Sequence, residues 1–332
     1  MMSMSHREMT FNSAGSSKAT GLARRRPFIA GAAALFLAVA VSGVCARGAY
    51  AQDAAPDAKA KGTACQTTIS ACGCVITKAD LYTLSGTFAA GSTFNADGSC
   101  IEVAAPNVDL NLNGATITGT SSSSGIGVFF LKRANNGVLE GFDATISKFE
   151  VGLQIESNNI LTDYFTTNSN TTGILIHGVH GGAITDFTSD SNTNGVVIED
   201  TTGSNINTFT AGSNTNYGVW VESSSNDQIN DFNTQKNGGT GTYVGCAATG
   251  GPSGARCTSG GRPSNNNRIY DAFSGSNGGD GIAIDLGDSG NLVTDIDATS
   301  NTGDDAVDEN PSCDHNLWFG NSITKAGSSC IH

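Results

Sequence analysis

A short repeat with a period of about 22 residues runs through the middle of this chain and limits the folds open to it. Each repeat opens with a glycine and an alternating apolar stretch, as in "GVVIE" from Gly195 and "GVWVE" from Gly218. Short alternating segments at this period, ended by Gly, Asn, Ser or Thr, are typical of a β-solenoid. The opening glycines are Gly152, Gly173, Gly195, Gly218, Gly241 and Gly281, and the last step is one period plus an insertion.

Three further landmarks keep the same period. Two are apolar and predict columns of stacked side chains inside the solenoid: Ile160, Ile184, Ile206, Ile229, Ile269 and Leu292, and then Phe165, Phe187, Phe209, Phe232 and Phe273. The third landmark is an asparagine that follows each phenylalanine at a constant spacing, which is one position shorter after Phe273. These asparagines are Asn170, Asn192, Asn214, Asn237 and Asn277. Asparagine tolerates a left-handed backbone, and its amide bonds to the same residue in the next coil, so we expect a ladder at a tight corner.

One coil alone cannot bury its apolar face, so the coils must stack. Each strand then pairs in parallel with its equivalent in the next coil, about 4.8 Å away. Leucine-rich repeats need leucines at fixed positions, and helical repeats need helix-forming residues, whereas this chain is rich in Gly, Asn and Thr. The repeat therefore predicts an all-β solenoid in a single domain.

The repeats from Gly125 to Asn301 resemble the parallel β-helix repeat of the pectate-lyase-like superfamily. So do the segments on either side of them, "CIEVAAPNVDLNLNGATITG" from Cys100 and "CDHNLWFGNSITKAGSSCIH" from Cys313. The resemblance implies a right-handed parallel β-helix of roughly nine or ten coils with disulfide-stapled ends. Because that superfamily contains lyases, hydrolases, epimerases and binding modules, the fold alone does not choose an activity.

The N-terminal segment has the features of an export signal. Three consecutive arginines end at Arg26, an apolar run "FIAGAAALFLAVAV" follows, and "AYA" ending at Ala51 is a suitable cleavage site. We therefore expect residues 1–51 to be a signal peptide of the general secretory or twin-arginine type, and the protein to be periplasmic or extracellular. The remaining segments are expected to be an N-terminal cap over 52–100, the β-helix over 101–310 and a C-terminal cap over 311–332.

Eight cysteines remain after residue 51, an even number that indicates disulfides in an exported protein. Cys246 and Cys257 bracket a glycine-rich insertion, and Cys313 and Cys330 bracket the C-terminus, so we expect each pair to be bonded. The pairing among the others is left open by the sequence: Cys65, Cys72, Cys74 and Cys100.

The chain beyond residue 51 is strongly acidic, with 11 basic and 29 acidic residues and a net charge of −18. Such a surface repels nucleic acid and anionic lipid and can attract cations. We expect a monomer with no membrane span and no nucleic-acid partner.

Alternation predicts which side chains leave the first strand of each coil toward solvent. One outward column would contain Gln154, Leu175, Val197, Trp220, Tyr243 and Ala283, and the next Glu156, His177, Glu199, Glu222, Gly245 and Asp285. Trp220 and Tyr243 offer flat faces on which sugars stack. Glu199 and Glu222 would share a proton or bind a cation such as calcium.

Together these residues indicate a site for polysaccharide. The chemistry resembles that of lyases and epimerases, in which a proton next to a uronate carboxylate is removed. Glu199 and Glu222 would hold the cation that neutralises the substrate acid, while His177 or Tyr243 would move the proton. The competing interpretation is that strand-end carboxylates solubilise the sheet and that Trp220 packs under the insertion.

A second acidic group lies nearer the C-terminus. The motif Gly303-Asp304-Asp305 resembles the paired aspartates of polygalacturonases, but the order of the histidine and arginine motifs is reversed here, which argues against that hydrolase. A calcium-binding or structural role for Asp304 and Asp305 is favoured. Three functions stay open: an enzyme acting on acidic polysaccharide, a glycan-binding module without catalysis, and a structural or adhesive envelope protein.

Overall fold

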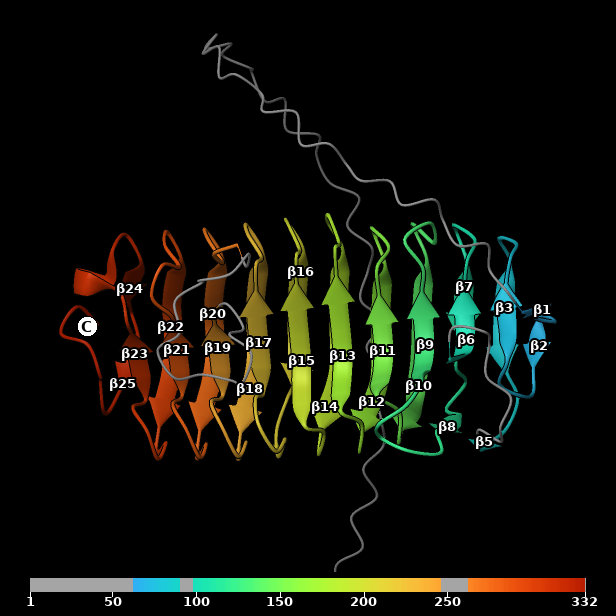
Figure 1. Cartoon of the computed structure of the whole chain (residues 1–332), viewed down its shortest axis with the longest axis horizontal. Helices are drawn as coiled ribbons and strands as arrows, with labels where there is room; N and C mark the ends of the chain where they lie inside the picture. Colours follow the sequence, from blue (N-terminus) through green and yellow to red (C-terminus); the bar gives the residue numbers. More distant parts are fainter. Residues whose placement is uncertain (1–61, 90–97, 246–261, 332) are drawn as a thin grey trace, which may run out of the picture. The chain divides into compact units, whose positions relative to one another are not determined.

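The computed structural model describes residues 62–89, 98–245 and 262–331. The chain divides into two units, Met1–Pro56 and Asp57–His332, and every described residue lies in the second. The predicted signal peptide and the predicted Cys246–Cys257 bond fall outside the described residues. Within them, the second unit is a parallel β-helix of about nine turns, which confirms the predicted fold (Figure 1).

Two parallel sheets form the body of this solenoid. In sheet A, eleven strands follow one another in the order β1 (Thr63–Ala64), β3 (Cys74–Ile76), β6 (Ser99–Val103), β9 (Ile126–Phe130), β11 (Val151–Ile155), β13 (Thr172–His177), β15 (Asn194–Glu199), β17 (Val219–Glu222), β19 (Thr242–Val244), β21 (Ile282–Ile284) and β23 (Ala306–Asp308).

Sheet B receives the chain after each strand of sheet A. Its main path is β2 (Thr68–Ile69), β4 (Leu81–Leu84), β7 (Asp109–Asn111), β10 (Val138–Ser147), β12 (Leu161–Asn168), β14 (Ala183–Asp190), β16 (Asn205–Thr210), β18 (Gln228–Gln235), β20 (Arg268–Gly275), β22 (Leu292–Thr299) and β24 (Leu317–Phe319). Three short strands lie off that path: β5 (Phe88–Ala89), β8 (Thr116–Thr118) and β25 (Ser322–Ile323). The only helix in the described segments is the 3-10 turn η1 (Pro311–Cys313).

One coil shows how the sequence forms the fold. After β15 the chain turns, runs back along β16 in sheet B, and turns again before β17 begins the next coil (Figure 1). Val196 and Ile198 of β15 and Ile206 of β16 point inward and are fully buried. Each such side chain contributes about 1.5–3 kcal/mol when it leaves water, so the stack of coils forms one continuous core.

The opening glycines form a column because the coils approach one another most closely there. A Cβ added to Gly195 would lie 2.4 Å from the carbonyl oxygen of Gly218, and one added to Gly218 would lie 2.6 Å from that of Gly241. No side chain larger than hydrogen is accommodated at such distances. The glycine of the repeat is therefore required by the coil-to-coil contact.

The predicted asparagine ladder is present at the turn from sheet B to sheet A. The backbone N–H of Asn192 donates to Oδ1 of Asn214 at 2.9 Å, and that of Asn214 donates to Oδ1 of Asn237 at the same distance. The column continues to Asn277 and Asn301, and Asp305 ends it by accepting from both the backbone N–H and the side-chain amide of Asn301. The ladder thus satisfies the buried polar groups of this corner.

Two predicted apolar columns need correction at their ends. Phe165, Phe187, Phe209 and Phe232 are in register and their rings stack, with centroids 4.7–5.9 Å apart. The next residue in that column is Ala272, while Phe273 pairs with Asn233 in the neighbouring outward column. The shorter spacing from Phe273 to its asparagine, one position less than in the other coils, is the cause.

The first and the last predicted residues of the isoleucine column are likewise out of register with it. Thr162 stands in register with Ile184, and Val293 with Ile269, so Ile160 and Leu292 are each out of the column. Ile160 is nevertheless buried in the core. The inward threonine is accommodated because its hydroxyl donates to the carbonyl of Thr185.

Disulfides lie at both ends of the described solenoid, as predicted. Cys313 and Cys330 are bonded, and the N-terminal pairs left open by the sequence are Cys65–Cys74 and Cys72–Cys100. Parallel pairing already begins at Thr63, inside the segment predicted to be the cap. Across the described residues, no helix is long and apolar enough to cross a membrane.

Candidate functional site on sheet A

The predicted outward columns of sheet A have the predicted register. Val197 pairs with Trp220, Trp220 with Tyr243, and Tyr243 with Ala283 along consecutive strands. In the next column His177, Glu199 and Glu222 are direct neighbours on β13, β15 and β17. Three of the four predicted catalytic side chains therefore share one row of the sheet, about one strand spacing apart.

His177 and Glu199 form an ion pair on this row. Nδ1 of His177 lies 3.2 Å from Oε2 of Glu199, and the two side chains are 40% and 39% exposed. The Glu199 carboxylate is the main cause that raises the pKa of His177; burial opposes it, and Glu156 and Asp200 add to it. Conversely, His177 lowers the pKa of Glu199. The carboxylate thus faces the imidazole at ion-pair distance, without the geometry of a hydrogen bond, and the imidazole remains partly exposed.

Tyr243 does not occupy the exposed position that the alternation predicted. Its side chain is only 6% exposed, because Tyr217 stacks on it with ring centroids 5.6 Å apart. Its hydroxyl donates to Oδ2 of Asp285 at 2.7 Å. Burial, followed by the Asp285 carboxylate, raises the pKa of Tyr243 far above its usual range. Tyr243 also lies three strands from His177, so the structure does not bring the two together.

Trp220 takes part in the same aromatic cluster. Its ring is tilted against Tyr217 at a centroid distance of 5.5 Å, and its side chain is half-buried. Its Nε1 is shielded from solvent and has no hydrogen-bond partner among the described residues. The cluster is completed by Tyr243, Ala283 and Val307. Sheet A therefore offers one half-buried indole rather than two open aromatic rings.

The second acidic group lies where the solenoid approaches its C-terminal end. Asp305 accepts hydrogen bonds from Asn301 and, through Oδ2, from the backbone N–H of Lys325, while Asp304 forms an ion pair with Lys325 at 3.2 Å. These contacts connect the final coils to one another. Across the described segments, no group of three or more His, Cys, Asp and Glu side chains is arranged to hold a metal ion.

Asp285, Asp288 and Asp308 are almost completely buried in the same region. Asp288 is fully buried: its Oδ1 accepts from the backbone N–H of Ser264, and its Oδ2 has no partner within the described part of the chain. Burial is the main cause that raises the pKa of Asp288 to about 7, with Asp285 and Asp308 adding to it. This group is therefore protonated over much of the range in which an ordinary aspartate is charged.

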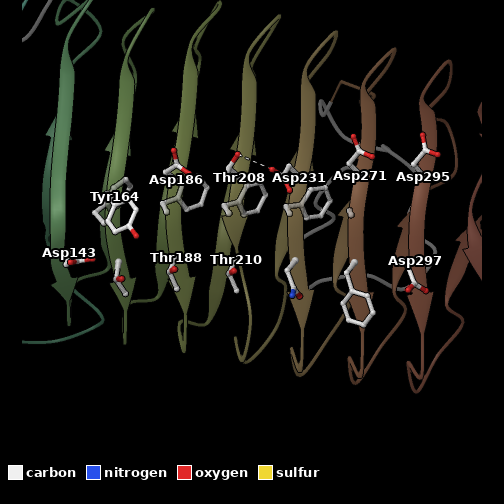
Figure 2. A pocket seen from close by; sticks show the side chains of 18 residues that line it. Asp143, Tyr164, Asp186, Thr188, Thr208, Thr210, Asp231, Asp271, Asp295 and Asp297 are labelled. Atoms are coloured by element: carbon white, nitrogen blue, oxygen red, sulfur yellow. Dashed lines mark hydrogen bonds between the residues drawn. The ribbon is translucent and has the colours of Figure 1, made fainter. Parts of the chain in front are cut away.

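A groove on sheet B, which the sequence analysis did not identify, has a volume of about 870 Å³ (Figure 2). It crosses the strands β10 to β22 at the point where each of them bends. Most of the bend residues are aspartates, and each directly precedes the residue that its strand contributes to the phenylalanine column. The bend residues are Asp143, Tyr164, Asp186, Thr208, Asp231, Asp271 and Asp295. The recurrent pair Asp-Phe, at Asp186 and Asp231, is the sequence signal that could have identified the groove.

No family model matches the sequence, and no curated protein matches it. Solved structures do match. The Dettilon tailspike protein gp208 has a TM-score of 0.59 over 79% of this chain, and the enzymatically active domain of tailspike protein 2 of bacteriophage CBA120 has 0.53 over 71%, each with 13% sequence identity. These likenesses show that the fold of this chain is a parallel β-helix.

The periplasmic alginate epimerase AlgG also matches this parallel β-helix, with 14% sequence identity and a TM-score of 0.50 over 67% of the chain. The β-helix described here spans 60% of the length of the Dettilon tailspike, 37% of the CBA120 domain and 50% of the epimerase. At identities this low the likenesses concern the fold.

Proposed function

We propose that this is an exported protein that acts on polysaccharide, and that the His177–Glu199 pair on sheet A is its proton-transfer centre. The observation that carries the proposal is the 3.2 Å contact between the two side chains on adjacent strands. Export is supported by three disulfides in the described residues, which favour an oxidising compartment. The carbohydrate class is supported by the fold shared with a protein named as a periplasmic alginate epimerase.

His177 is the base in this proposal, and Glu199 positions it. Neutral imidazole removes the proton next to the carboxylate of a uronate residue, and the adjacent Glu199 stabilises the imidazolium that forms. The electron pair left on carbon then expels the oxygen of the glycosidic bond, which takes the proton from the His177 imidazolium, as in a lyase, or it takes a proton from water on the opposite face, as in an epimerase. Glu222 is one strand further along the same row.

Calcium at Glu199 and Glu222 remains a prediction. The ion takes six to eight oxygen ligands, and two glutamates in one row supply fewer than that. Asp304 and Asp305, the other predicted calcium ligands, are engaged by Lys325 and Asn301. The proton transfer at His177 does not depend on either site.

The test is turnover of uronate-containing polysaccharides by the purified protein. Lyase products are followed by ultraviolet absorbance and epimerised products by NMR. We expect His177→Ala to abolish turnover and His180→Ala, a substitution of an exposed histidine in the following turn, to leave it unchanged. Undiminished turnover in His177→Ala would remove this residue from the mechanism.

The pH profile provides a second readout. Because Glu199 raises the pKa of His177, the neutral base forms only at a pH above that of an ordinary histidine. Glu199→Gln removes the main cause of this shift, so the rising limb of the activity profile moves to lower pH. A limb that stays in place would show that another group titrates.

Binding without catalysis is the second candidate, favoured by the half-buried Trp220 beside Tyr217. The partly exposed indole of Trp220, at the surface of a rigid sheet, can contact a sugar ring. This function predicts glycan affinity without turnover and its loss in Trp220→Ala. A structural or adhesive protein would show neither affinity nor turnover.

A further inference from the structure

The groove on sheet B follows from a repeated backbone bend. In seven consecutive strands one residue has φ between 51° and 66°, the left-handed region that most L-residues avoid: Asp143, Tyr164, Asp186, Thr208, Asp231, Asp271 and Asp295. The bend turns each strand, and the outward side chains on both sides of it line one channel. Because the bend recurs in register, the channel runs across the strands (Figure 2).

Each wall of the groove is a column of mostly polar side chains. Beyond the bend, Thr166, Thr188 and Thr210 are neighbours in register, followed by Asn233, Phe273 and Asp297. Figure 2 shows Asp186, Asp231, Asp271 and Asp295 in one row and Thr188, Thr210 and Asp297 in a second row, with Asp143 at the level of the second row. The stacked rings are only 3–5% exposed and form an apolar floor.

Aromatic side chains mark two positions along the groove. Tyr164 of β12 is 61% exposed, and Phe273 of β20 faces outward in the second row. They are four strand spacings apart, which corresponds to about 19 Å. A pyranose residue in an extended chain advances by a length close to one strand spacing, so the two rings are placed to contact sugars about four units apart.

The charge of the groove restricts its ligand. Among the described residues that line it are six aspartates and no Lys, Arg or His: Asp143, Asp186, Asp231, Asp271, Asp295 and Asp297. Carboxylates in neighbouring strands repel one another, and the pKa of Asp163, beside Tyr164, is raised by burial and by Asp186. A polyuronate or a nucleic acid would add negative charge to this row, whereas a chain bearing regularly spaced amines would neutralise it.

We propose that the groove on sheet B binds a linear polysaccharide of 2-amino-2-deoxy sugars with free amines, one sugar to each coil. The ammonium groups pair with the bend aspartates, the threonine row accepts and donates hydrogen bonds to hydroxyls, and Tyr164 and Phe273 contact sugar faces. This site lies on the other sheet from His177 and is separate from the proton-transfer centre. It attaches the protein to a polymer rather than reacting with it.

The test is calorimetric titration of the full secreted protein with a glucosamine hexamer, below the pKa of its amines. The N-acetylated hexamer, a hexauronate and hexalysine serve as comparison ligands. We expect the glucosamine hexamer to bind, and the other glycans to bind at least ten-fold more weakly. High salt should weaken the binding of the glucosamine hexamer because the ammonium–aspartate ion pairs are exposed to solvent. Equal affinity for the N-acetylated hexamer or for hexalysine would overturn the assignment, as would no binding of the glucosamine hexamer.

Variants locate the binding on the groove. Asp231→Asn with Asp271→Asn removes two charges while keeping a residue type that tolerates the left-handed backbone, so the fold is retained. We expect at least a ten-fold loss of affinity for the glucosamine hexamer, and a similar loss in Tyr164→Ala. Glu150→Gln, a substitution of an exposed carboxylate outside the groove, is the matched control and retains affinity. Unchanged binding in the aspartate pair would place the ligand elsewhere.

Discussion

The side-chain amide of Asn214 donates to Oδ1 of Asn237 in the next coil at 3.1 Å, and its second hydrogen bond goes to the carbonyl of Ser189 in the preceding one. Asn214 also accepts from the backbone N–H of Asn192. One residue, itself almost completely buried, therefore connects three successive coils at this corner.

Asn214→Ala should destabilise the solenoid strongly. It leaves the N–H of Asn192 and the carbonyl of Ser189 buried without these partners, at about 1–3 kcal/mol for each group. We expect a loss of roughly 2–6 kcal/mol, seen as a lower urea midpoint by circular dichroism. Asn216→Ala, in the exposed part of the same turn, should change stability by less than about 0.5 kcal/mol. Equal effects of the two substitutions would contradict the ladder's role.

Gly195→Ala should also be destabilising, for a steric reason. The added Cβ would lie 2.4 Å from the backbone oxygen of Gly218, so the coils would have to separate, at a cost of about 1–3 kcal/mol. Gly182→Ala is the matched control because its nearest neighbour, Cγ1 of Val179, is 3.7 Å away. Thermal unfolding of both variants distinguishes them, and equal melting temperatures would disprove the close contact.

Asp288 should make stability depend on pH. Its pKa in the folded protein is raised to about 7, so between about pH 4 and 7 the folded state keeps a proton that the unfolded state has lost. The free energy of unfolding should therefore fall as pH rises through this window and level off above it. Asp288→Asn removes the titration and still accepts from the N–H of Ser264, so its stability should show a smaller slope. Parallel pH profiles for the two proteins would refute the assignment.

The Cys313–Cys330 bond should stabilise the C-terminal end. It closes a loop with a sequence separation of 17, which contributes about 3 kcal/mol to the free energy of unfolding. It also holds the segment after the last strands, β24 and β25, whose outer edges would otherwise template association. The double Cys→Ser variant should unfold at lower temperature and aggregate, as measured by light scattering. A variant that stays monomeric and equally stable would show that the bond is dispensable.

The sequence predicted the features whose residue type is dictated by the backbone. The corner requires asparagine and the close contact requires glycine. The spacing of these two residue types therefore predicted the length of a coil, the parallel pairing of its strands and their register. The outward row of His177, Glu199 and Glu222 followed from the same register. These predictions depended only on period and alternation, which are properties of the repeat itself.

Features that depend on packing across turns were not predictable. Alternation indicated that Tyr243 points outward, but it could not show that Tyr217 covers it and that Asp285 accepts its hydroxyl. The sheet B groove was missed because one left-handed residue in each strand changes which side chains share a face. Asp186 and Thr208 occupy equivalent bends, although nothing in a threonine indicates such a backbone.

The insertion after Val244 has a consequence for how this chain can change. Asn237 and Asn277 are ladder partners at a sequence separation of 40, against 23 for Asn214 and Asn237. The backbone hydrogen bonds of the two pairs nevertheless measure 3.0 Å and 2.9 Å. Neighbouring coils are thus held in register by local contacts, and the length of chain between the contacting residues does not change these contacts. Evolution or an engineer can therefore place a foreign segment at that point of a coil without shifting the coils on either side.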